Sequence, residues 1–188
     1  MKKKTVALLM AVVMLFGVTV GGTLAWLKAE TTEVKNTFTP SDIGLTLTET
    51  TTDYQMVPGN KIAKDPVVKV DADSEDCWLF VKIEKSSNYG TYLEEYSVRS
   101  PWVKLQDGVY YIEGAKANDE YYVLAGEGTA ELANGFVTVK TSVTKADMEA
   151  ITDAASQPTL TFTAYAVQSA NVTDAATAWQ IAQGLKTN

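Results

Sequence analysis

The sequence contains no histidine and a single cysteine, Cys77. The first absence excludes Ser-His-Asp triads, histidine general bases and every zinc site with a histidine ligand. The second excludes an intramolecular disulfide framework and any metal site built from several cysteines. Basic residues are also few, since 16 Lys and Arg stand against 23 Asp and Glu, for a net charge of −7. Because phosphate binding needs a basic face, this balance argues against nucleic acid as a partner.

The remaining composition is that of an ordinary globular domain. The 188 residues are 46% hydrophobic and 21% charged, which suits one domain that buries its own core. No local pattern indicates a cofactor, and no spacing singles out a pair of catalytic carboxylates. We therefore expect no cofactor and no enzymatic activity.

The first 25 residues have the pattern of a secretory signal peptide. Lys2–Lys4 form a positive start, and an uncharged apolar run covers Thr5–Val20. The small residues Thr23 and Ala25 precede a cleavage point, so we expect the mature chain to begin at Trp26. An uncleaved anchor is the alternative, because the apolar helix would span a bilayer if it continued for a few more residues. Cleavage removes three of the 16 basic residues, which leaves 13 against 23 acidic ones, a net charge of −10.

Short strand patterns separated by glycine and proline turns follow. In Ile43–Thr48 every second residue is apolar, and the run from Cys77 to Ile83 is apolar on both faces at its start, which is typical of a central strand. A Pro-Gly pair at 58–59 predicts a type II turn, and an Asp-Gly pair at 107–108 predicts a hairpin. Further strands are expected at Pro66–Val70, Trp102–Leu105, Val109–Ile112, Glu120–Leu124, Phe136–Val143 and Leu160–Ala166.

Two helices are expected among these strands. Thr144 predicts the N-cap of the first, Asp147 completes an approximate capping box, and Pro158 ends the helix. Thr173 predicts the N-cap of the second, with Asp174 near the positive end of its dipole. Its apolar stripe is expected to contain Ala178, Ile181, Ala182 and Leu185, with Trp179 beside it. Residues 40–188 are therefore expected to form a mainly β domain, a jelly roll or β-sandwich of about eight strands with two short helices.

The start of the chain and its last strand share their arrangement with a known family. Gly21–Ala25 follows the apolar run, Asn36–Thr39 leads into Ile43–Leu47, and Phe162–Gln168 is followed by Ala178–Trp179. In these features the chain resembles the TasA/camelysin family of Gram-positive bacteria, most strongly over about residues 1–70 and moderately over 158–182. The resemblance implies a jelly-roll domain, export through a SipW-type signal peptidase, and assembly into extracellular biofilm-matrix fibres.

The resemblance also implies a role for residues 26–39. In filament-forming relatives the segment after the cleavage point completes a sheet in the next subunit by donor-strand exchange. Trp26, Val34 and Phe38 lie on one face of an extended segment and are the candidate inserting side chains. Such a strand supplies both backbone hydrogen bonds and side chains to an open sheet edge. The alternative is that Thr31–Phe38 is simply the first strand of its own sandwich.

These expectations describe a secreted structural subunit that assembles head-to-tail with copies of itself. The resemblance adds a SipW-type signal peptidase, other matrix proteins and polysaccharide as partners, with membrane contact only through the signal peptide before cleavage. One alternative is a monomeric surface adhesin or carbohydrate-binding module that uses exposed aromatic residues. A second is a camelysin-like secreted peptidase, although a zinc peptidase would normally show His-Glu-x-x-His.

Three further features have two interpretations each. Asp71, Asp73 and Glu75 offer oxygens to calcium, but the loop lacks the glycine and glutamate of an EF-hand, and a solvated turn is the alternative. Cys77 is either a buried thiol or half of an intermolecular disulfide. A group of aromatic residues forms either an exposed binding surface or core and cross-strand pairs. Its members are Tyr89, Tyr92, Tyr96, Tyr110, Tyr111, Tyr121, Tyr122 and Trp102.

Overall fold

The computed structural model describes residues 42–50, 54–126 and 135–185. Within these ranges the chain is mainly β, as the sequence predicts, with nine strands in antiparallel sheets, three short α-helices and no closed barrel. The strands are β1 (Leu45–Thr48), β2 (Lys61–Lys64), β3 (Val67–Val70), β4 (Cys77–Lys85), β5 (Val103–Gln106), β6 (Val109–Ala115), β7 (Glu120–Tyr122), β8 (Gly135–Thr138) and β9 (Leu160–Gln168). The helices are α2 (Tyr89–Tyr92), α3 (Lys145–Glu149) and α4 (Ala175–Ala182), with a 3₁₀ turn η1 (Ala154–Ser156).

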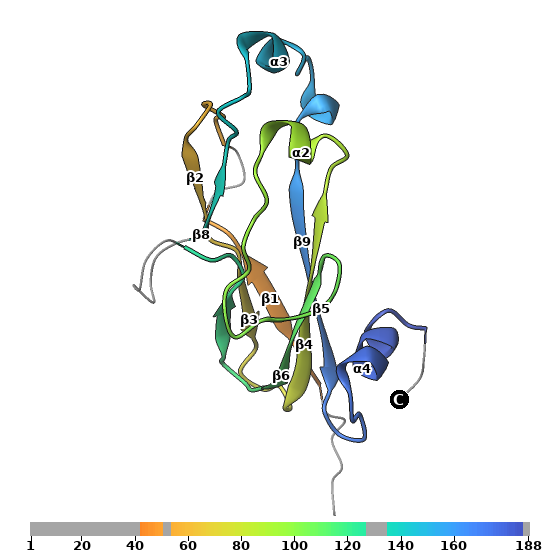
Figure 1. Cartoon of the computed structure of the whole chain (residues 1–188). Helices are drawn as coiled ribbons and strands as arrows, with labels where there is room; N and C mark the ends of the chain where they lie inside the picture. The colour runs from red at the N-terminus through yellow and green to blue at the C-terminus, as the bar shows by residue number, and fades with distance from the viewer. Residues whose placement is uncertain (1–41, 51–53, 127–134, 186–188) are drawn as a thin grey trace, which may run out of the picture. The chain divides into compact units, whose positions relative to one another are not determined.

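The strands form three sheets in the described ranges (Figure 1). One has the order β1-β3-β7, the second joins β2 to β8, and the third has the order β5-β6-β4-β9. The predicted central strand β4 is confirmed, because it pairs with β6 on one side and along nine residues with β9 on the other. Only Asp65 and Pro66 separate β2 from β3, so this run changes from one sheet to another over two residues.

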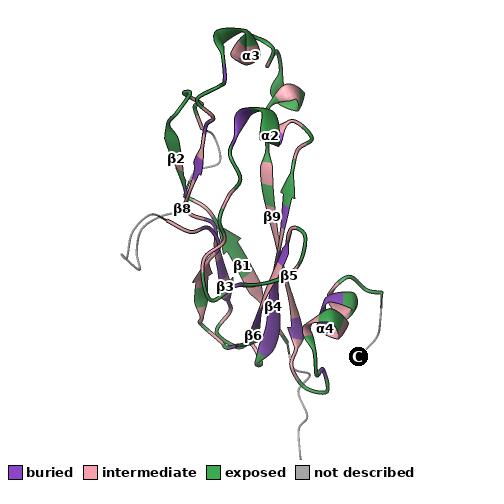
Figure 2. Cartoon of the chain, in the orientation of Figure 1, coloured by how far each residue is buried: buried purple, intermediate pink, exposed green. Residues whose placement is uncertain are grey.

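The main core lies between the three-stranded and the four-stranded sheet. Val68 and Val70 of β3 are fully buried in it, and so are Cys77, Leu79 and Val81 of β4, with Ile83 4% exposed. Figure 2 shows β4 buried along much of its length. Its buried members are Val68, Val70, Cys77, Leu79, Val81, Ile83, Trp102, Ile112, Ala115 and Val123. Two sheets that share one apolar interior make a β-sandwich.

The opposite face of the four-stranded sheet is covered by α4. Trp78 and Phe80 point to this side of β4, and Trp179 of α4 packs against Phe80 with ring centroids 5.3 Å apart. Trp179 is 5% exposed, so it belongs to the packed face of the helix rather than beside it. The predicted inclusion of Leu185 in that face is wrong, since Leu185 is 74% exposed and follows the helix. The last turn ends at Gly184, whose φ of +70° suits glycine.

A third cluster closes one end of the sandwich. Buried side chains from α2, β8 and the following turn meet partly buried ones from β2 and the α3 region. The buried members are Tyr89, Tyr92, Leu93, Leu124, Val137, Val139 and Val143. Gly135 opens β8 at a crowded point, where an added Cβ would meet the Leu124 side chain and the Lys64 carbonyl oxygen. The absence of a side chain at Gly135 therefore permits the close approach of β8 to β2.

Most predicted turns and caps are confirmed. Asn60 N donates to Val57 O at 3.0 Å with φ of +80° at Gly59, as a type II turn requires. The Asp-Gly hairpin joins β5 to β6, and Thr144 and Asp147 form the expected capping box.

Two helix details differ from the predictions. The N-cap of α4 is Asp174 rather than Thr173, because its carboxylate accepts from Thr177 N at 2.8 Å. The first predicted helix does not continue to Pro158. It ends after Glu149, and Asp153 caps the separate turn η1.

Candidate functional site

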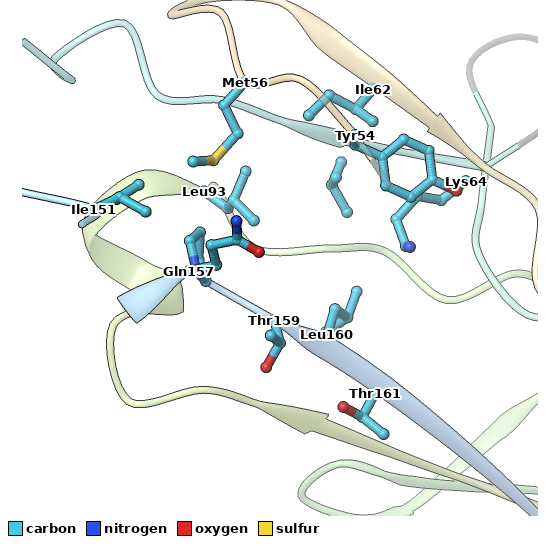
Figure 3. Close-up of a pocket in the computed structure, with 12 residues that line it drawn as sticks. Tyr54, Met56, Ile62, Lys64, Leu93, Ile151, Gln157, Thr159, Leu160 and Thr161 are labelled. Atoms are coloured by element: carbon cyan, nitrogen blue, oxygen red, sulfur yellow. The ribbon is translucent and has the colours of Figure 1, made fainter. Parts of the chain in front are cut away.

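A hollow among the described residues lies between β2 and the start of β9. It has a volume of about 630 Å³, within the range of known ligand sites. Its lining residues are Tyr54, Met56, Ile62, Lys64, Leu93, Val137, Ile151, Gln157, Pro158, Thr159, Leu160 and Thr161. Figure 3 shows the Lys64 ammonium and the Gln157 amide facing the interior from opposite sides. We call this hollow the Lys64 cavity; apolar side chains and a few polar groups share its wall.

Lys64 is the only buried charged residue among those described, with 8% of its surface exposed. Its Nζ lies 2.8 Å from Glu49 Oε1, and the two side chains are 9% and 14% exposed. The rings of Tyr54 and Phe162 lie 4.4 and 5.8 Å from Nζ, within the distance of a cation–π contact. A buried ammonium is thus neutralised by one carboxylate and flanked by two aromatic faces.

Tyr54 completes this polar group. Its hydroxyl donates to Glu49 Oε1 at 3.0 Å, the same oxygen that Lys64 approaches. Burial raises the pKa of the Tyr54 hydroxyl, and the hydrogen bond to the Glu49 carboxylate raises it further. Tyr54 therefore stays protonated at neutral pH and donates a hydrogen bond to Glu49.

Two open strand edges run beside this cavity. β9 is the last strand of the four-stranded sheet and β1 the last of the three-stranded one, so each has one edge without a strand partner among the described residues. Ser169 N donates to Asp76 O, which identifies the hydrogen-bonded pairs of the β4–β9 ladder. Because alternate residues of an antiparallel strand face opposite edges, Phe162 and Ala164 direct their backbone groups away from β4.

The same side of the sandwich is incompletely covered. Phe162 and Ala164 of β9 face the main core but are only partly buried, whereas Val81 of the adjacent β4 is fully buried. On β1, Leu45 packs against this core, and Leu47, two residues further on the same face, is 38% exposed. Parts of β1 and β9 approach within 8 Å between Cα atoms, yet no ladder joins them. The sandwich thus has one incompletely covered side, at β1 and β9.

The predicted calcium residues are not brought together. The described residues contain no group of three or more Asp, Glu, Cys or His side chains positioned to hold a metal ion. The carboxylate of Asp71 instead accepts from Thr46 Oγ1 at 3.0 Å, while Ser74 N donates to the Asp71 carbonyl. Asp71, Asp73 and Glu75 lie in the turn between β3 and β4.

The aromatic residues and Cys77 are structural where the structure describes them. Tyr89, Tyr92 and Trp102 are 1%, 7% and 7% exposed, so they belong to the core rather than to a binding surface. The remaining tyrosines are partly buried on or beside the strands. Cys77 is fully buried, and desolvation raises the pKa of its thiol to about 11. The thiol therefore stays protonated and shielded in the folded chain.

Several predicted residues lie outside the described ranges. These are the cleavage residues Thr23, Ala25 and Trp26 and the donor candidates Val34 and Phe38. Within the described ranges, no helix combines the length and the apolar character needed to cross a bilayer.

The sequence patterns did not indicate the centre of the cavity. Strand β2 was not predicted, because Lys61 and Lys64 stand at its two ends and charged ends obscure the period-two pattern. The sequence also carried no sign that Lys64 pairs with Glu49, because Glu49 precedes Lys64 by fifteen residues and follows β1. The chain was then compared with known proteins. No family model, curated protein or solved structure matches it.

Proposed function

We propose that this chain is a secreted structural subunit of extracellular biofilm-matrix fibres that assembles head-to-tail. In this proposal residues 26–39 of one copy add a strand to the sandwich of the next. The observation that carries it is the incompletely covered side of the sandwich, where β1 and β9 have open edges over half-buried apolar side chains. An extended segment supplies the missing backbone partners and covers those side chains.

The positions of the two ends favour an open chain of subunits. The described part begins at Asp42, and β1 then runs from Leu45 to Thr48 toward Glu49 at the Lys64 cavity. Residues 26–39, the segment donated to the next copy, would therefore leave their own subunit at the start of β1, which lies away from the cavity. A contact between different surfaces of identical subunits need not close into a ring, so it extends into a fibre.

The other functions receive less support. The adhesin alternative relied on exposed aromatic residues, and Tyr89, Tyr92 and Trp102 are buried. The peptidase alternative would need a reactive group, and the Lys64 cavity offers an ion pair and a tyrosine that retains its proton. The SipW-type peptidase, the matrix partners and the extracellular location belong to the proposal through the family resemblance.

The test compares the mature chain, residues 26–188, with a variant that begins at residue 40. We expect filaments of the mature chain in electron micrographs and a folded monomer of the shortened chain by sedimentation and circular dichroism. A synthetic peptide of residues 26–39 should bind the shortened variant and raise its melting temperature. Filaments of the shortened variant would contradict the donor role, and loss of its fold would favour a first strand within the same subunit.

A further inference from the structure

The Lys64 cavity favours an uncharged occupant, and only part of residues 26–39 is uncharged. Lys64 lines it and is paired with Glu49, and no other charged side chain among the described residues lines it. An additional charge brought beside this buried pair would lack a partner, at a high cost in desolvation. The occupant that fits is therefore an uncharged one with an apolar side chain.

Within residues 26–39, charge selects the last four. Lys28, Glu30, Glu33 and Lys35 are spread along the first ten residues, and Trp26 would carry the amino terminus of the mature chain. Asn36–Thr39 is uncharged and contains Phe38. Its amide and hydroxyl oxygens suit the Lys64 ammonium, which has three N–H donors, one of them directed to Glu49. The phenyl ring suits the apolar wall formed by Met56, Ile62 and Leu160 (Figure 3).

The length of the chain limits how far Phe38 can reach toward the Lys64 cavity of its own sandwich. Asp42 and Glu49 are seven residues apart along the extended run that contains β1, a distance of about 23 Å. Phe38 precedes Asp42 by four residues, which reach at most about 14 Å when fully extended. The Cα atom of Phe38 therefore cannot reach Glu49, the partner of Lys64, along its own sandwich. This limited reach favours a Phe38 from another copy as the occupant of the cavity.

We propose that the Lys64 cavity is the receiving site for Phe38 of a second copy. This inference rests on the proposed function and specifies the contact within it. The ring of Phe38 lies among Met56, Ile62 and Leu160, and Lys64 donates to an oxygen of Asn36–Thr39 of the same incoming segment. The paired charges also select the incoming segment, because a strand that brings a charge to this position is disfavoured.

Disulfide trapping between separate copies tests the contact. One copy carries Phe38→Cys, the other carries Leu160→Cys, and both carry Cys77→Ala so that no other thiol is present. We expect the oxidised mixture to give at least tenfold more crosslinked pairs than a matched mixture with Val34→Cys. Equal or stronger trapping through Val34 in filaments that still form would overturn the Phe38 contact and leave the proposed function intact. Absence of any assembly of the mature chain would overturn both.

Two further measurements test whether the Phe38 that enters the cavity comes from another copy and whether assembly depends on it. A single chain that carries both Phe38→Cys and Leu160→Cys is treated with oxidant at high dilution, where copies rarely meet. We expect no disulfide within this chain, and an intramolecular disulfide would contradict the reach argument. In the otherwise native mature chain, Phe38→Ala should raise the protein concentration needed for filaments at least tenfold, while Phe38→Leu should raise it far less. Unchanged assembly of the alanine variant would also overturn the proposal.

Discussion

Replacing Lys64 by methionine should destabilise the domain far more than a surface lysine change does. Methionine keeps the apolar stem of the side chain but leaves Glu49, whose side chain is 14% exposed, without its cation. Breaking one partner of a buried ion pair costs about 3–5 kcal/mol. Glu49 keeps the hydrogen bond from Tyr54 and is 14% exposed, so we expect the lower end of that range, about 3 kcal/mol. For a domain of this size this corresponds to a fall in melting temperature of about 6–12 °C.

The assay is urea unfolding of the mature chain under dilute, monomeric conditions. Lys145→Met is the matched control, because Lys145 pairs with Glu149 on an exposed helix where the side chains are 88% and 66% exposed. That change should cost at most about 0.5 kcal/mol. The double variant Lys64→Met/Glu49→Leu removes both buried charges and should return to within about 1 kcal/mol of the native chain. If Lys64→Met costs no more than Lys145→Met, the buried-pair reasoning is refuted.

Two further predictions concern the core. Trp179→Ala removes a buried ring that lies 5.3 Å from the Phe80 ring and 5.2 Å from the Tyr165 ring, and should cost about 3–5 kcal/mol in urea unfolding; a loss below 1 kcal/mol would contradict the packing of α4. The Cys77 thiol, with its pKa raised to about 11, should resist iodoacetamide at pH 8 in the folded chain and react as the pH approaches 11 or in urea, since only the thiolate reacts. Equal rates for folded and unfolded chains at pH 8 would contradict its burial.

The strand and turn patterns of the sequence predicted most of the sandwich because they are local signals. The apolar run from Cys77 has both faces buried, and the Asp-Gly and Pro-Gly pairs have the backbone conformations that their residue types favour. The helix α2 was not predicted, since Tyr89–Tyr92 is one turn long and is held by the burial of its two tyrosines rather than by helix propensity.

The candidate site was less predictable, because it depends on contacts between distant residues. Lys64 meets Glu49 and Phe162 only after three separate parts of the chain have packed together. Sequence spacing carries no signal for such a group, and a lysine at a strand end reads as a solvated charge. The open edges of β1 and β9 likewise follow from the order of strands in the sheets, which local periodicity does not determine.

The long ladder between β4 and β9 bears on mechanical strength in a fibre of the proposed kind. Hydrogen bonds of an antiparallel pair lie perpendicular to the strands, so a pull along β9 loads the whole nine-residue ladder in shear instead of opening it one bond at a time. β4 itself is wedged between two apolar layers, one on each face. Tension that enters through a strand beside β9 is therefore passed to the most deeply anchored strand of the subunit.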